Sequence, residues 1–124
     1  DCKGHYVVHH TDERLSEKKR DKLQDAALRR ILPTIRSLGM SSSVDIVVCS
    51  NLNFRELQEL QEASQARGSA GIKAAINKHK DKGHQAHQNE FAVLEDLLGN
   101  LRSAGAVFVY TQKEDMCLLL PLAQ

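Results

Sequence analysis

The sequence lacks most of the features that mark specialised classes of protein. It has no Trp, two Tyr, three Phe and only two Pro among 124 residues. No stretch approaches the roughly 20 apolar residues of a membrane-spanning helix, and the first residues contain no apolar signal region. So few aromatic side chains do not provide the stacking platform of a single-strand nucleic-acid binder. We therefore expect a cytoplasmic chain without a membrane partner.

An excess of charge of one sign is also missing. Lys and Arg number 17 and Asp and Glu 16, which gives a formal net charge of +1. This balance excludes a bulk electrostatic attraction to nucleic acid or membrane. A length of 124 residues is that of one domain. Because the first residue is Asp1 and not Met, we expect either a processed chain or a domain excised from a longer protein.

Cysteine is scarce and unpatterned. Cys2, Cys49 and Cys117 form no C-x-x-C pair and no metal-ligand spacing. An odd, widely spaced set does not build a disulfide framework, and Cys49 and Cys117 lie in apolar runs, where thiols are usually buried. Neither the dinucleotide fingerprint G-x-G-x-x-G nor a P-loop occurs. We therefore expect no cofactor and no metal site.

Four short apolar runs predict strands. Tyr6–His10 and Val44–Cys49 are rich in β-branched residues, and the second is apolar on both pleat faces apart from Asp45, as is typical of a central strand. Ala106–Thr111 and Met116–Leu120 are separated by four polar residues and predict a hairpin.

One long helix is predicted between the first two strands. Apolar residues recur at helical spacing from Glu13 to Leu38. Thr11 or Asp12 can cap its start and Gly39 can end it. Pro33 lies inside the pattern and removes one backbone donor, so we expect it to kink or divide the helix.

Two more helical regions follow the second strand. Asn53 and Glu56 form a capping-box pattern at the start of the first. Glycines interrupt it at residues 67–71, and a further turn or two of helix follows at Ile72–Ile76. The next helix is predicted from Asn89 to Ser103 by its periodic Phe and Leu residues.

The alternation of strands and helices predicts an α/β protein in the order β-α-β-α-α-β-β. Such an order calls for parallel pairing with right-handed crossovers, helices on both faces, and a final antiparallel strand at one edge. We therefore predict a small three-layer sandwich. A more antiparallel α+β arrangement is the alternative, because the pattern does not determine the order of four strands.

Polar side chains follow the predicted parallel strands at their carboxyl ends, where open α/β sheets bind ligands. Backbone amides near Asn51 to Asn53, at the start of a helix, would suit a small anionic or polar ligand. A simpler interpretation also exists, because Asp12 and Asn53 are expected as helix caps, and strand alternation lets only one of His9 and His10 line a given pocket. The candidate ligand-binding residues are His9, His10, Asp12, Cys49, Asn51, Asn53 and Thr111.

The same edge also suggests an enzyme. Cys49 lies just ahead of a helix start, a position that can lower the pKa of a thiol. A Cys49 nucleophile assisted by His9 or His10, with Asp12 orienting the ring, would suit sulfur or acyl transfer. The alternative is that Cys49 is simply part of the core. The catalytic residues of such an enzyme stay unassigned.

Residues 78–88 have no apolar periodicity and predict an exposed, basic, His-rich loop. Its lysines would give sequence-independent affinity for RNA or another anion, and two imidazoles with a lysine would suffice for a metal-independent ribonuclease. No Cys or carboxylate pair completes a metal shell around His84 and His87. A plain solvated loop is the alternative. The candidate anion or nucleic-acid residues are Lys78, Lys80, Lys82, His84 and His87.

Because no catalytic motif is complete, the sequence favours a ligand- or protein-interaction module that is part of a larger protein or assembly. Pro121 suits the end of an edge strand, because proline cannot donate to a ladder. An edge of this kind invites pairing with another strand. We therefore predict a protein partner or self-association through the C-terminal edge strand, and the two enzyme hypotheses stay open beside it.

Overall fold

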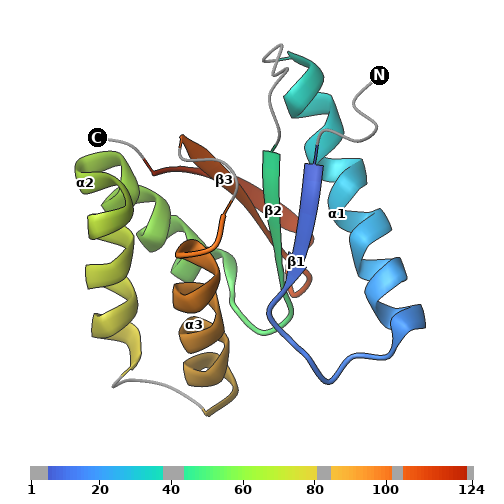
Figure 1. Ribbon diagram of the computed structural model, residues 1–124, viewed down its shortest axis with the longest axis horizontal. Helices are drawn as coiled ribbons and strands as arrows, with labels where there is room; N and C mark the ends of the chain where they lie inside the picture. Colours follow the sequence, from blue (N-terminus) through green and yellow to red (C-terminus); the bar gives the residue numbers. More distant parts are fainter. Residues whose placement is uncertain (1–5, 38–43, 81–84, 102–104, 123–124) are drawn as a thin grey trace.

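A four-stranded sheet lies between one helix on one face and two helices on the other (Figure 1). The computed structural model describes residues 6–37, 44–80, 85–101 and 105–122, without the side chains of residues 80 and 85–87. The elements in chain order are β1 (Tyr6–His10), α1 (Glu17–Ser37), β2 (Val44–Cys49), α2 (Phe54–Lys80), α3 (Gln85–Leu98), β3 (Ala106–Thr111) and β4 (Met116–Pro121). The predicted α/β order is therefore confirmed.

The strands lie in the order β1-β2-β3-β4. β1, β2 and β3 are parallel, with His9 opposite Val47, and β4 is antiparallel to β3. The predicted C-terminal hairpin is thus confirmed, and the antiparallel α+β alternative is excluded. The turn between β3 and β4 requires a left-handed residue, which is Asp115 at φ 51°. Aspartate accepts this conformation more readily than most residues do.

The hand of the crossovers differs from the prediction. Both parallel connections step one strand in the same direction, from β1 to β2 and from β2 to β3. However, α1 packs on one face of the sheet and α2 with α3 on the other (Figure 1). Two steps in the same direction over opposite faces have opposite hand, so one crossover is left-handed, which is rare. The prediction of right-handed crossovers throughout is wrong for that one.

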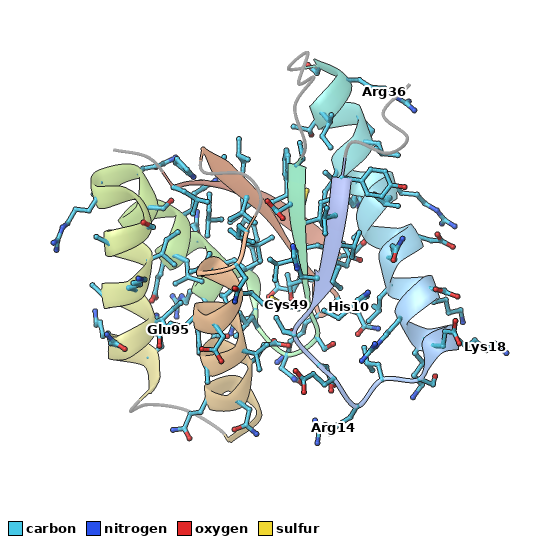
Figure 2. All side chains as sticks on the ribbon, viewed as in Figure 1. His10, Arg14, Lys18, Arg36, Cys49 and Glu95 are labelled. Carbon is cyan, nitrogen blue, oxygen red and sulfur yellow. The ribbon has the colours of Figure 1, made fainter. Side chains whose placement is uncertain are left out.

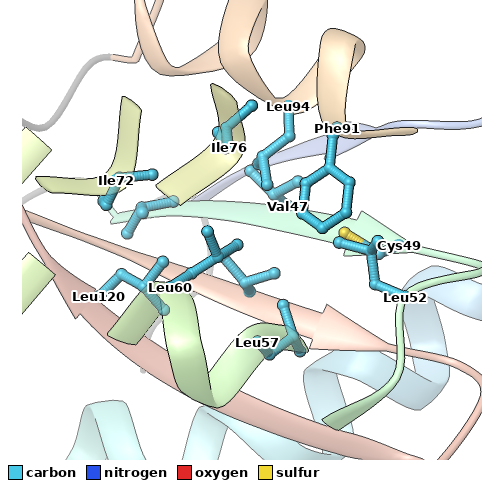
Figure 3. Packing of buried hydrophobic residues seen from close by; sticks show 12 residues of the cluster. Val47, Cys49, Leu52, Leu57, Leu60, Ile72, Ile76, Phe91, Leu94 and Leu120 are labelled. Atoms are coloured by element: carbon cyan, nitrogen blue, oxygen red, sulfur yellow. The ribbon is translucent and has the colours of Figure 1, made fainter. Parts of the chain in front are cut away.

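Strand alternation divides the core into two layers. On one face, α1 contributes Leu23, Ala27, Ile31 and Ile35, all buried. On the other face, α2 and α3 pack against the side chains of β2 and β3 that point the opposite way (Figure 3). All six residues of β2 are buried, as predicted for a central strand. The members of this second layer are Val47, Cys49, Leu52, Leu57, Leu60, Ile72, Ile76, Phe91, Leu94, Val107, Val109 and Leu120.

α1 starts later than predicted and is not divided. It begins at Glu17, and Ser16 caps it, because the Ser16 hydroxyl accepts a hydrogen bond from the amide of Lys19 at 3.3 Å. Asp12 instead accepts the amide of Arg14 at 3.0 Å and forms a tight turn ahead of the helix. Pro33 lies inside the continuous helix. The predicted end near Leu38 and Gly39 lies outside the described residues.

α2 begins as predicted and continues past its glycines. The Asn53 amide donates to Glu56 Oε1 at 2.9 Å, and the Glu56 amide donates to Asn53 Oδ1 at 2.8 Å, which completes the capping box. At Arg67 and Gly68 the backbone leaves helical geometry, and Gly68 takes φ 62° and ψ −144°, a region open almost only to glycine. A Cβ on Gly71 would meet the carbonyl oxygen of Ala63 at 2.1 Å, so this kink brings two turns into close contact.

Within the predicted loop at residues 78–88, the residues that the structure describes, 78–80 and 85–88, are helical. α2 extends to Lys80, and α3 begins at Gln85 rather than Asn89. His79 explains part of this error: its ring stacks on Phe91 with centroids 5.1 Å apart, and its Nε2 lies 2.6 Å from Glu59 Oε2. The polar residue His79 therefore packs α2 against α3, although the apolar periodicity gave no sign of a helix there. Lys82 and His84 lie outside the described residues, and so does the predicted end of the third helix at Ser103. No helix in the described ranges is long and apolar enough to cross a membrane.

The outer edge of β4 is partly occupied by α2. Gln61 Nε2 donates to the Leu119 carbonyl oxygen at 3.0 Å, and the Ser69 amide donates to the Leu122 carbonyl oxygen at 3.0 Å. Pro121 ends the strand, as predicted. The chain therefore supplies partners for two carbonyl groups at this end of the sheet, and pairing with another protein through β4 stays a prediction.

Candidate ligand site at the carboxyl end of the sheet

The two histidines that end β1 have different surroundings. His9 points toward the α3 side, and its Nε2 lies 2.9 Å from the buried carboxylate of Asp45 on β2. His10 lies on the α1 side of the strand (Figure 2), and burial together with the positive charge of Arg20 lowers its pKa. Only one of the two can line a given pocket, as strand alternation predicts.

Cys49 is buried at the end of β2, where it packs beside Leu52 and Phe91 (Figure 3). Its side chain is 0% exposed. Burial and the negative charge of Glu90 raise the pKa of this thiol well above its usual value. A reactive cysteine needs the opposite environment, because the thiolate is the nucleophile.

The proposed catalytic trio is not assembled. His9 binds Asp45, while Asp12 Oδ1 accepts both the amide and the Nε of Arg14, at 3.0 and 3.3 Å. No imidazole binds Cys49 or Asp12 within the part of the chain that the structure describes. The core interpretation of Cys49 fits its surroundings better than the catalytic one.

The centre of this edge is Glu90, from the second turn of α3. Its side chain is only 3% exposed and reaches across to the loop that follows β2. Oε2 accepts the hydroxyl of Thr11 at 2.6 Å and the amide of Ser50 at 2.9 Å. Oε1 accepts the amides of Asn51 at 2.8 Å and Leu52 at 2.9 Å. One carboxylate thus joins the end of β1, the loop after β2 and α3.

The amides that the sequence assigned to an anionic ligand are therefore bonded to the protein's own carboxylates. Glu90 takes those of residues 50–52, Glu56 takes that of Asn53, and Glu114 takes that of Phe54 at 2.9 Å. Thr111 is also committed, because its buried hydroxyl donates to the Leu52 carbonyl oxygen. An anion could use these donors only by displacing a carboxylate.

A hollow of about 210 Å³ opens beside Glu90. It lies between the segment after β1 and the first turns of α3. Three carboxylates and one guanidinium line it, and the guanidinium of Arg14 is itself bonded to Asp12. Negative charge is therefore in excess at its wall. The lining residues are Thr11, Asp12, Glu13, Arg14, Asn51, Asn89, Glu90 and Val93.

The structure brings together only part of the candidate set. Asp12 and Asn51 line the hollow; Cys49, Asn53 and Thr111 lie in the core or in caps near it. Glu90 was not among the residues selected from the sequence, because it is charged and comes directly before Phe91, the first apolar residue of the helix predicted from Asn89. A signal was present: Glu90 is four residues before Leu94 and seven before Leu97, so helical spacing places it on the inward face.

The structure does not test the basic candidates, because Lys78 is the only one of the five whose side chain it describes. Lys78 is exposed on α2. Lys80 and His87 lie on helices, but their side chains are not described. Among the described residues, no group of three or more His, Cys, Asp or Glu side chains is arranged so that it could hold a metal ion. Anion or RNA binding by Lys78, Lys80, Lys82, His84 and His87 stays a prediction.

No family model, no curated protein and no solved structure matches this chain. The function of the site is therefore argued from its geometry.

Proposed function

We propose that the protein is a binding module that accepts a basic side chain of a partner polypeptide in the hollow beside Glu90. The observation that carries this proposal is the excess of carboxylates around a pocket whose nearby backbone donors are already bonded. A cationic group would meet acceptors there, whereas an anionic group would meet repulsion.

The hollow is large enough for one charged group of a partner but too small for a whole drug-sized molecule. Sites that enclose drug-sized molecules measure roughly 300–1,000 Å³, and this one measures about 210 Å³. The end of a Lys or Arg side chain, held by the rest of its polypeptide outside, fits this scale. The contact resembles the capture of one charged anchor at the edge of a protein interface.

Asp12 and Glu13 are the groups that would receive the cation. Glu90 already accepts four hydrogen bonds and serves as a fixed wall. Asp12 uses only Oδ1 for Arg14, and its Oδ2 has no hydrogen bond within the described residues. Glu13 is exposed at the rim. The polar residues Asn51 and Asn89 complete the wall of the hollow.

The test is fluorescence anisotropy with a labelled six-residue lysine peptide and the same peptide acetylated on every Nζ. The matched variants are Asp12→Asn/Glu13→Gln and, as control, Glu17→Gln/Glu62→Gln, which removes two exposed carboxylates outside the hollow. The parent and the control should bind the charged peptide at least fivefold more tightly than the acetylated one. The proposal would be contradicted if the parent bound the two peptides equally, or if both double variants lost affinity for the charged peptide to the same extent.

A further inference from the structure

A second hollow lies on the opposite face of the sheet, under the first turns of α1. It measures about 480 Å³, which is within the range of small-molecule sites. It is bounded by α1, by the segment that precedes this helix, and by the end of β3 with its turn. The lining residues are Leu15, Lys19, Lys22, Leu23, Ala26, Tyr110 and Gln112.

This hollow combines an apolar floor with a cationic rim. Leu23 and Tyr110 are buried, and Leu15 and Ala26 are half-buried, so the floor is formed by carbon atoms. The Tyr110 hydroxyl is turned to Asp115 Oδ1 at 2.6 Å. Lys19 and Lys22 are exposed and lie three residues apart, hence on one side of the helix. Neither ammonium group forms an ion pair in the described ranges of the chain.

A neighbouring hollow extends the positive charge. It measures about 300 Å³, is lined by Ala26, Arg29, Arg30 and Asp115, and meets the second hollow at Ala26. Asp115 is neutralised there by Arg30, whose Nη2 lies 2.5 Å from Oδ2. The ion pair holds the pKa of Asp115 below its usual value, so this carboxyl stays charged and stays paired. The groove along this side of α1 is therefore positive at both ends.

We infer that this groove binds an organic anion with a flat apolar body, such as an aromatic carboxylate or sulfonate. The apolar body lies on Leu23, Ala26 and the Tyr110 ring, and the acidic group pairs with Lys19 and Lys22. This site is independent of the proposed basic-side-chain site, because it uses the other face of the sheet and the opposite charge. The anionic ligand predicted from the sequence was expected near Asn51 to Asn53, whereas the anion inferred here binds at the same end of the sheet on the α1 side.

The test uses 2-naphthalenesulfonate as the probe and two-dimensional ¹H–¹⁵N spectra of the labelled protein. The probe should shift the amides of Lys19, Lys22, Ala26, Tyr110 and Gln112 in a saturable way at millimolar concentration. The neutral 2-naphthalenesulfonamide should bind at least fivefold more weakly. Raising the salt concentration should also weaken binding of the sulfonate, because exposed charges are screened.

Three variants separate charge from cavity shape. Lys19→Gln/Lys22→Gln should lose at least fivefold in affinity, while the matched control Lys18→Gln/Lys73→Gln, two exposed lysines outside the groove, should bind as the parent does. Lys18 points away from the sheet in Figure 2. Ala26→Leu fills the floor and should abolish binding with both lysines present. No saturable shift in the parent, equal affinity in the two lysine variants, or full binding by Ala26→Leu would overturn the inference.

Discussion

At the carboxyl end of the sheet, the side chain of Glu90 should contribute more to the free energy of unfolding than any other single side chain. Replacing it by Ala removes the acceptor of three backbone amides and of the Thr11 hydroxyl. Thr11 retains the Val48 carbonyl oxygen at 3.1 Å, and water can reach the amides of Ser50 and Asn51, which are half-buried. The amide of Leu52 is left buried without a partner.

The expected loss follows from these groups. An unpaired buried amide costs about 1–3 kcal/mol, and the lost methylene adds about 0.8 kcal/mol. Glu90→Ala should therefore lower the free energy of unfolding by about 2–4 kcal/mol. Glu90→Gln should lose about 1 kcal/mol, because its oxygen can still accept the amides of Asn51 and Leu52. Asp96→Ala, an exposed carboxylate on the same helix, should change stability by less than about 0.5 kcal/mol.

The assay is urea unfolding followed by far-ultraviolet circular dichroism, since the chain has no Trp for a fluorescence measurement. The slope of free energy against urea should stay constant across the four proteins, so that the midpoints can be compared. A loss below about 0.5 kcal/mol for Glu90→Ala, or a larger loss for Glu90→Gln than for Glu90→Ala, would refute the reasoning.

Further predictions concern the kink, the buried thiol, His10 and Tyr110. Gly71→Ala should destabilise the protein more than Ala70→Gly does, because the new Cβ would meet the Ala63 carbonyl oxygen; similar melting temperatures for the two variants would argue against the close contact. In a Cys2→Ser background, a thiol reagent should modify Cys117 under native conditions and Cys49 only after unfolding, since Cys49 is 0% exposed and its pKa is raised; fast labelling of Cys49 would contradict this. Burial lowers the pKa of His10 in the folded state, so the unfolded chain binds the proton more readily: stability is full above the unfolded pKa of about 6.5 and falls as the pH drops below it. His10→Gln should flatten the dependence of the urea midpoint on pH between 7 and 5, and an unchanged slope would count against this role. Burial and the bond to Asp115 raise the pKa of Tyr110 to about 12, so in Tyr6→Phe the remaining phenol should ionise near that pH in an ultraviolet titration, and a midpoint near 10 would disprove it.

The sequence predicts the strands and the C-terminal hairpin well, because these depend on local apolar runs, whereas the order of the strands in the sheet was not predicted. The buried β2 run, the β3–β4 hairpin and the Asn53–Glu56 capping box are all confirmed. The helix ends were harder to predict. The first turn of α3 carries polar residues, so it has no apolar periodicity, and the start of α1 depends on whether Asp12 or Ser16 bonds to an amide.

The sequence points to one edge of the sheet, because ligands of open α/β sheets bind at the carboxyl ends of parallel strands. At that edge Asp12 and Asn51 line a hollow, and ligand binding there stays a proposal. The contribution of Glu90 depends on where α3 lies, some 40 residues along the chain from the amides it binds, and no local pattern encodes that distance. The hand of each crossover likewise depends on which face of the sheet each helix packs against, and no local pattern encodes that choice.

The most direct test of the basic-side-chain site is to locate the contact itself. Two-dimensional ¹H–¹⁵N spectra of the labelled protein, titrated with the lysine peptide, should show saturable shifts at Asp12, Glu13, Asn51, Asn89 and Val93, the residues around the hollow. The amides of the α1 groove, such as those of Lys19 and Lys22, should not move. Shifts confined to other surfaces, or the same pattern with the acetylated peptide, would contradict the proposed function.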